Sequence, residues 1–166
     1  AIVAIGDELA HVEHYMQIQQ IRNAGRIRYR AQVDPVISQY AVPRITLQPI
    51  VENAVYHGIM EKPEKSGTIL VTGAFDGQDI LITVEDDGVG FGAKDTGAMA
   101  EIGQQDVSDL QKGSHYGLSN IDKRIKLRYG GGYGLEVRSV SGEGTRVTIR
   151  LPRRHPDDPV SKVAPA

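Results

Sequence analysis

The chain has 166 residues and a net charge of −2, with 40% apolar and 24% charged side chains, which is typical of one globular domain. This near-neutral charge makes the chain a poor candidate for a nucleic-acid clamp, which needs a surplus of Lys and Arg. No apolar run approaches the roughly 20 residues that cross a bilayer, no secretory signal opens the chain, and the lack of cysteine excludes disulfides and thiolate metal sites.

The first half of the chain predicts a helix, two strands and a second helix. The first helix carries an apolar stripe at heptad-like spacing, made of Ile5, Leu9, Val12 and Met16. Because its other faces are polar, this stripe needs a partner, inside or outside the chain. The predicted elements are a helix at 6–24, strands at 26–33 and 40–42, and a helix that ends near His57, with Pro49 either near its first turn or kinking it.

The second half predicts two hairpins, a long loop and a third helix. Thirteen of the nineteen glycines lie between Gly88 and Gly144, and such clusters mark turns or places where backbone approaches a ligand. Residues 92–114 lack periodicity and are expected to form a mobile lid. Regular elements are predicted as a hairpin of 69–75 with 79–85, a helix at 117–129, and a hairpin of 135–140 with 145–151.

The order of these elements predicts an α+β fold. Two hairpins among three helices indicate a two-layer α/β sandwich, in which a mixed and largely antiparallel sheet carries helices on one face. No internal repeat is present. Residues 155–166 hold three of the eight prolines and no apolar pattern, so we expect a disordered tail there.

The helix that ends near His57 carries a polar face beside its apolar stripe. Asn53, Tyr56 and His57 are spaced i, i+3 and i+4, so they share one face of an α-helix. The amide oxygen of Asn is a hard ligand suited to Mg²⁺. A helix with an incidental surface Asn explains the same pattern, so these residues alone leave both readings open.

The strand before Asp86 runs into two alternating glycines, Gly88 and Gly90. An Asp at this place can accept a hydrogen bond from an exocyclic amine, and the glycines let backbone approach a flat ring. A tight turn with polar caps is the alternative reading. The pattern is not a dinucleotide-binding fingerprint, because Ala93 stands where the third glycine is required, and no P-loop lysine motif occurs.

Two further glycine segments follow. Residues 113–120 lead into a predicted helix, and the N–H groups and positive dipole end of a helix N-terminus bind phosphate. A loop that needs glycine to enter a helix explains them equally well. Residues 141–145 connect the last two strands, and a hairpin turn accounts for them without any ligand.

Each segment is weak evidence alone, but their order is specific. The chain resembles the ATP-binding domain of the histidine-kinase, gyrase, Hsp90 and MutL superfamily, and within it the catalytic domain of LytS-type sensor histidine kinases. The likeness runs from about Gly6 to Pro152 and implies a Bergerat-type ATP-binding fold preceded by one stalk helix. The phrases that carry it are LQPIVENAVYHGI, VEDDGVGF, YGLSNIDKRIKLRYG and GEGTRVTIRLP.

The resemblance implies a role for each motif. Asn53 is expected to ligate Mg²⁺, and Asp86 to read the adenine amino group. The second glycine segment is expected to hinge the lid near the phosphates, and Thr145 to lie near the adenine. The residues that the resemblance assigns to ATP binding are Asn53, His57, Asp86, Gly88, Gly90, Gly113, Gly117, Leu118, Gly142, Gly144 and Thr145.

The candidate catalytic residues are Asn53 and Glu52. In the gyrase and Hsp90 branches a Glu one turn before the Asn activates water, but Pro49 occupies that position here. Glu52 points about 100° away from Asn53 on an α-helical wheel, so we expect poor hydrolysis and a γ-phosphoryl group kept for a histidine. Two departures from the family pattern are His115 for a glycine and Tyr56 where a lysine is frequent.

The resemblance therefore implies a fragment of a histidine protein kinase that binds Mg-ATP and donates the γ-phosphoryl group to a histidine on a stalk domain. It implies the cytoplasmic portion of a membrane-anchored protein without its phosphoacceptor helix. The implied partners are its own stalk in a homodimer and, indirectly, a response regulator, with no nucleic acid. The implied boundaries are 1–25 for the stalk helix, 26–154 for the ATP-binding domain and 155–166 for the tail.

Two other functions fit the same residues. One is a stand-alone ATPase or serine kinase of the same superfamily, which would turn over ATP or phosphorylate a serine. The other is an adaptor that kept the fold and lost the nucleotide. The intact Asn53 and Asp86 argue against the adaptor.

Overall fold

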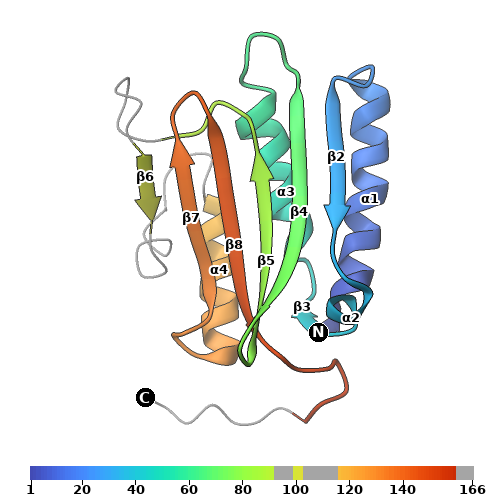
Figure 1. Ribbon diagram of the computed structural model, residues 1–166, viewed down its shortest axis with the longest axis vertical. Helices are drawn as coiled ribbons and strands as arrows, with labels where there is room; N and C mark the ends of the chain where they lie inside the picture. Colours follow the sequence, from blue (N-terminus) through green and yellow to red (C-terminus); the bar gives the residue numbers. More distant parts are fainter. Residues whose placement is uncertain (92–98, 103–115, 160–166) are drawn as a thin grey trace.

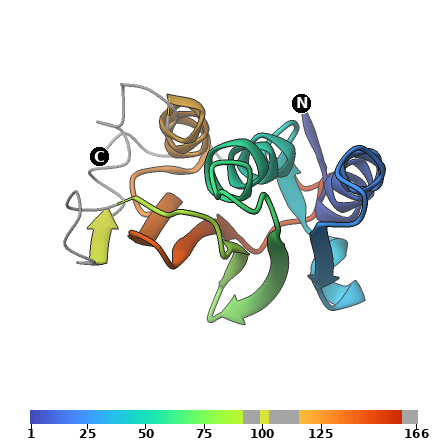
Figure 2. The same cartoon turned by 90° about the horizontal axis from the view of Figure 1, so that it is seen from above.

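A computed structural model describes residues 1–91, 99–102 and 116–159, and it shows a main sheet of six strands with helices packed on one face (Figure 1, Figure 2). The main sheet has the strand order β2-β4-β5-β8-β7-β6; β2 pairs with β4 in parallel and the other pairs are antiparallel. The strands are β2 Ile27–Gln32, β4 Gly67–Asp76, β5 Asp79–Asp86, β6 Met99–Ile102, β7 Gly134–Val140 and β8 Gly144–Pro152. The predicted two-layer α+β sandwich is confirmed.

Three helical segments form the second layer, above the sheet in Figure 2. One apolar core fills the space between the layers, with Val71, Ile82 and Ile149 on the sheet side and Val51 and Ile125 on the helix side. A separate antiparallel pair, β1 Ile2–Ala4 with β3 Ala41–Pro43, lies beside a short helix, α2 Pro35–Ser38. The covering segments are α1 Ile5–Arg22, α3 Leu47–Asn53, which continues as the π-helix η1 Ala54–Ile59, and α4 Tyr116–Tyr129.

The regular elements follow the predicted pattern, with exceptions among the short ones. Both hairpins are present, and Gly77 adopts a positive φ of 58° in the first of them. The expectation that 92–114 lacks regular structure was wrong for β6, which pairs with β7. Residues 92–98 and 103–115, and with them the predicted lid motion, lie outside the described residues. Short β1 and α2 were not predicted, because three or four residues carry no readable period.

The start of the predicted disordered tail is packed, not free. The His155 ring stacks on Tyr40 with centroids 4.5 Å apart. The His155 N–H donates to Asp158 Oδ2 at 2.8 Å, and the Ala41 N–H donates to the Arg154 carbonyl at 2.6 Å. Aromatic stacking and backbone bonds to β3 therefore order residues 155–159, while 160–166 lie outside the described residues.

The first helix, α1, docks on the rest of the chain through its predicted stripe. Ile5, Val12 and Met16 are fully buried and Leu9 is partly buried in the common core. The partners of the stripe are α3, β2 and α2 of the same chain. The stripe therefore finds its partner within the chain.

A carboxylate on α1 also caps the N-terminus of α3. Glu8 is buried, and its Oε1 accepts hydrogen bonds from the N–H groups of Thr46 at 2.6 Å and Leu47 at 3.2 Å. Thr46, at the N-cap position of α3, turns its own hydroxyl to the Pro43 carbonyl at 2.6 Å and caps nothing. Glu8 thus satisfies N–H groups that the start of a helix leaves free, and its negative charge suits the helix dipole.

Glu8→Ala should lower the free energy of unfolding by about 1–3 kcal/mol, because two buried N–H groups lose their acceptor. Chemical denaturation of the whole chain measures this change. Glu13→Ala is the matched control: Glu13 is an exposed glutamate on the same helix, and its removal should change stability by no more than about 0.5 kcal/mol. Equal losses in the two variants would contradict the capping role.

Candidate functional site

The helix that carries Asn53 changes its hydrogen-bonding pattern at that residue. Pro49 lies in the first turn of α3, as predicted, and α3 ends at Asn53. The next turn is the π-helix η1, in which the Met60 N–H donates to the Val55 carbonyl at 2.9 Å. Single π-helical turns occur frequently at functional sites. Because this turn is wider than an α-helical turn, the α-helical spacing that predicted a shared face for Asn53 and His57 does not apply beyond Asn53.

The π-helical turn places Gly58 against the end of β5. A Cβ atom on Gly58 would lie 2.6 Å from Asp86 Oδ1, and one on Gly88 would overlap the backbone of Gly58. The Val89 N–H donates to the Gly58 carbonyl at 3.0 Å. Two backbones therefore meet here without intervening side chains, which only glycine permits. The sequence patterns indicated Gly88 as a site residue but did not indicate Gly58.

Asp86 ends β5 with its carboxylate facing this contact. Its Oδ1 accepts the Gly88 N–H at 2.8 Å, and its backbone pairs with Thr145 of β8. The pKa of Asp86 is raised to about 7, chiefly by burial; hydrogen bonds from the backbone of Gly88 and Thr145 oppose the rise, and the nearby Asp87 carboxylate adds to it. A carboxylate this dehydrated gains from any ligand that donates a hydrogen bond to it.

The turn between β7 and β8 locks onto the residues after Asp86. Gly144 has φ +135° and Gly90 has φ +63°; side chains there would overlap the carbonyls of Asp86 and Val140, respectively. The Gly142 N–H donates to the Val89 carbonyl at 2.6 Å. The two predicted glycine segments thus form one interlocked edge of the sheet.

Ser139 joins the same segments from β7, and sequence reasoning missed it. Its side chain is buried, and its Oγ accepts the Phe91 N–H at 2.7 Å. The same Oγ lies 3.1 Å from the Gly144 carbonyl and 2.8 Å from Thr145 Oγ1. A serine at an inward position of a strand whose preceding inward residues, Leu135 and Val137, are apolar was the available signal. An open hollow of about 340 Å³ lies at this edge, lined by Glu85, Asp86, Arg138, Ser139, Val140, Glu143, Gly144, Thr145 and Arg146.

The remaining predicted residues occupy different surroundings. Asn53 is partly exposed and has no side-chain hydrogen bond to the residues that the structure describes, whereas Glu52 Oε1 accepts from Gln48 Nε2 at 3.0 Å. Gly117 is exposed in the first turn of α4. The Leu118 side chain is buried in the core, so a ligand could reach only its backbone. Gly113 and His115 lie outside the described residues.

A known protein family matches more than half of the chain. The model for the histidine kinase-, DNA gyrase B- and HSP90-like ATPase family matches residues 43–155, which include α3, η1, β5, α4 and the final hairpin. The chain belongs to this family. The match covers the segments that converge at the glycine-rich edge and confirms the resemblance drawn from the motifs.

Curated relatives are sensor histidine kinases. The chain is 32% identical to BtsS of Escherichia coli K12 over 92% of its length, and 32% identical to YesM of Bacillus subtilis over 93%. It is 29% identical to LytS of Staphylococcus haemolyticus over 90%. These alignments cover 24%, 24% and 25% of the three relatives, so the chain spans about a quarter of their length.

Solved structures of histidine kinases share the fold. The catalytic domain of histidine kinase ThkA matches with a TM-score of 0.65 at 15% identity, over 93% of this chain and 97% of that one. A blue-light-activated histidine kinase of Erythrobacter litoralis matches with a TM-score of 0.58 at 22% identity, over 91% and 42% of the two chains. Within the described ranges, no helix combines the length and hydropathy that spanning a bilayer requires.

Asp86→Asn should change how stability depends on pH. The pKa of Asp86 is about 7 in the folded chain, against an ordinary value of 3.8 for a solvent-exposed aspartate. The contribution of this group to stability is therefore fully present below about pH 4 and is lost as the pH rises to about 7. Relative to the wild type, the free energy of unfolding of the variant should rise by on the order of 2 kcal/mol between pH 5 and pH 8.

Denaturant titrations at several pH values measure this difference. Asp157→Asn, which removes an exposed carboxylate, controls for the loss of a negative charge as such. A constant difference between wild type and Asp86→Asn across this pH range would show that Asp86 ionises normally in the folded chain.

Proposed function

We propose that this chain binds Mg-ATP at the glycine-rich edge and presents the γ-phosphoryl group to a histidine on a separate stalk domain. The observation that carries the proposal is the convergence of the β5 end, the β7–β8 turn and the η1 turn through backbone contacts at Gly58, Gly88 and Gly144. Family membership supports the use of ATP, and the sensor-kinase relatives support a histidine as acceptor.

The proposed base contact is made by Asp86. Its carboxylate keeps acceptor capacity beyond the bonds from the backbone of Gly88 and Thr145, and an exocyclic adenine amine would donate to it. Guanine carries a carbonyl at that position and offers no donor. The proposed place for the flat ring is the open hollow beside the carboxylate, which Asp86, Gly144 and Thr145 line, and Thr145 lies opposite Asp86 on β8.

The residues present also fit a magnesium ion. Asn53 offers an amide oxygen with no other side-chain partner among the described residues, and Mg²⁺ prefers few protein ligands together with phosphate oxygens and water. No group of three or more His, Asp or Glu side chains within 1–91, 99–102 and 116–159 could enclose a metal without those oxygens. When bound, the ion would neutralise phosphate charge.

The residues of α3 before Asn53 favour transfer of the γ-phosphoryl group to a protein acceptor over hydrolysis of ATP. One turn before Asn53 stands Pro49, which cannot act as a base. Glu52 is already hydrogen-bonded to Gln48, and we propose that it does not activate water efficiently. Gly117, at the N-terminus of α4, and His57, exposed on the turn after Asn53, complete the proposed phosphate surroundings. Catalysis would then depend on positioning of the γ-phosphoryl group rather than on a protein base.

The context of the whole protein belongs to the same proposal. We assign residues 1–25 to the end of a stalk and 26–154 to the ATP-binding domain. The full-length protein would be a membrane-anchored kinase whose cytoplasmic portion dimerises through the stalk and passes its phosphoryl group to a response regulator. The proposal is supported by relatives that are about four times as long as this chain.

Calorimetric titration with ATP, with and without Mg²⁺, tests the site. The wild type should bind ATP more tightly with Mg²⁺, and Asn53→Ala should lose most of that gain while folding normally, because its amide is partly exposed. Gln17→Ala, which removes an exposed amide on α1, should behave as wild type. An undiminished Mg²⁺ effect in Asn53→Ala would exclude Asn53 as ligand, and no ATP binding at all would favour the adaptor.

This chain should not phosphorylate itself. His11 and His14 are exposed on α1, which its buried stripe holds against the domain, so neither can come within the roughly 3–3.5 Å of the γ-phosphoryl group that transfer needs. His155 is stacked on Tyr40 beside β3. Incubation with γ-labelled ATP should leave the chain unlabelled, and a separate stalk fragment with an acceptor histidine should become labelled. Acid-labile phosphate on this chain alone would refute the assignment.

A further inference from the structure

Arg124 of α4 binds the short connection that leads into α3. Its Nη2 atom donates to the Ile45 carbonyl and lies 3.2 Å from Thr46 Oγ1. Arg124 is an exposed residue, so water could hydrate its guanidinium group in place of these bonds. Burial therefore does not account for the contact, which makes a directional link between two of the helices that cover the sheet.

The connection that Arg124 binds is strained and closely held. Ile45 has a φ of 60°, in the left-handed region that a β-branched residue adopts only at a cost. Thr46, the next residue, is fully buried; its N–H donates to Glu8 and its hydroxyl to the Pro43 carbonyl. Strained backbone persists where surrounding contacts hold it, and Arg124 supplies the hydrogen bond to the Ile45 carbonyl. Loss of that bond would let the start of α3 relax.

The link lies at equal distances from two residues of the proposed nucleotide site. The helices α3 and α4 run in opposite directions, so the end of α3 and the start of α4 lie toward the same end of the sheet (Figure 1). Asn53 is seven residues after Thr46, and Gly117 is seven residues before Arg124. At a rise of about 1.5 Å per residue, each lies roughly 10 Å along its helix from the link.

Apolar packing alone does not fix how far α3 lies along α4. Both helices contribute buried residues to the common core, Ile50 and Val51 from α3 and Ile121 and Ile125 from α4. The hydrophobic effect is non-directional, so such contacts tolerate small shifts of one helix along the other. A hydrogen bond depends on distance and angle, and the bond from Arg124 therefore selects one register.

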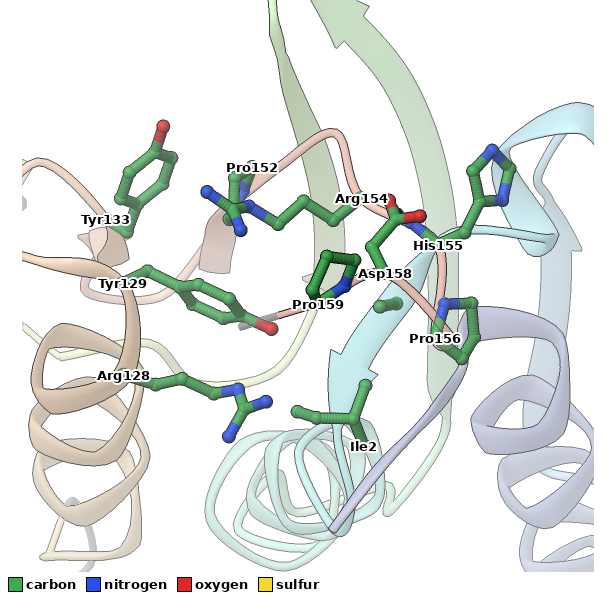
Figure 3. Close-up of a pocket in the computed structure, with 11 residues that line it drawn as sticks. Ile2, Arg128, Tyr129, Tyr133, Pro152, Arg154, His155, Pro156, Asp158 and Pro159 are labelled. Atoms are coloured by element: carbon green, nitrogen blue, oxygen red, sulfur yellow. Dashed lines mark hydrogen bonds between the residues drawn. The ribbon is translucent and has the colours of Figure 1, made fainter. Parts of the chain in front are cut away.

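The C-terminal end of α4 is itself held in place (Figure 3). Arg128 and Tyr129, in its last turn, line a small cavity of about 70 Å³ together with Ile2 of β1 and Pro152 of β8. These strands place the end of α4, and Arg124 lies about one turn before Arg128. The link therefore joins α3 to a helix that has its own anchor on the rest of the domain.

We propose that Arg124 is a positioning residue for Mg-ATP: it fixes the register of α3 against α4 and, with it, the separation of Asn53 and Gly117. The inference rests on the proposed function, which assigns these two residues to the magnesium ion and the phosphates. The Gly58 carbonyl is held at the end of β5 by its own hydrogen bond, so the adenine contact of Asp86 should not depend on Arg124. The role of Arg124 is therefore confined to the phosphate end of the nucleotide.

Calorimetric titration of the whole chain with Mg-ATP and NMR titration with adenosine test the proposal. Arg124→Gln should weaken Mg-ATP binding by about tenfold, a usual scale for coupling between separate sites, because Asn53 and Gly117 are no longer held in register. Adenosine carries no phosphate, so its affinity, read from the amide resonance of Gly88, should change by less than about twofold. Both titrations compare folded protein, at a temperature well below the Tm of every variant.

Two further variants separate positioning from the loss of a charge. Lys123→Gln removes an exposed positive charge from the neighbouring position of α4 and should bind Mg-ATP as the wild type does. Arg124→Lys should recover most of the affinity. A single nitrogen of Arg124 makes both contacts in the structure, and a lysine amine can donate to two acceptors.

Equal affinities of the wild type and Arg124→Gln for Mg-ATP would overturn the role of Arg124. Equal losses for Mg-ATP and adenosine would overturn it too, because they would indicate a general disturbance of the fold, and so would an Arg124→Lys variant that binds no better than Arg124→Gln. These outcomes leave the proposed function intact. A wild type that binds neither ligand would instead overturn the proposed function, and the role of Arg124 with it.

Discussion

The contact that organises this molecule is one between backbones. Gly58, at the π-helical end of the second covering helix, lies directly on Gly88, just past the end of β5, and the β7–β8 turn closes on the same residues through Gly144. A side chain at any of these positions would separate the layers at this edge. The contact buries the Asp86 carboxylate, and that burial raises its pKa. The raised pKa of Asp86 thus follows from the close backbone packing that the glycines permit around its carboxylate.

The helix that presents Asn53 is braced from both sides. Glu8 of α1 accepts hydrogen bonds from the start of α3, and Arg124 of α4 donates to the Ile45 carbonyl and lies 3.2 Å from Thr46 Oγ1. Ile45 has a positive φ of 60°, a conformation that costs a branched residue energy, and the guanidinium bond helps to hold it there. Side chains from α1 and α4 therefore both bind the N-terminus of α3. A displacement of α1 would break the hydrogen bonds from Glu8 to the start of α3.

The two ends of β8 serve different purposes. Its first residues, Gly144 and Thr145, complete the glycine-rich edge, whereas Pro152 and the segment after it wrap under the sheet toward β3. Between these ends β8 is paired with β5 on one side and β7 on the other. The segment after β8 is held in place by two aromatic contacts: the His155 ring stacks on Tyr40, and the Arg153 guanidinium lies over the Phe75 ring.

Alternation, helical spacing and turn chemistry are local properties, so the sequence alone was enough to determine both hairpins, three helices and the α+β class. The order of its motifs also determined the family, and most of the candidate residues. Tertiary structure decided the π-helical turn, the roles of Gly58, Ser139 and Glu8, and the packing of residues 155–159. Each of these features depends on which residue, distant in the sequence, packs against it in the folded chain. A contact such as that of Glu8 with Thr46 produces no repeating pattern in the sequence, so the sequence alone cannot predict it.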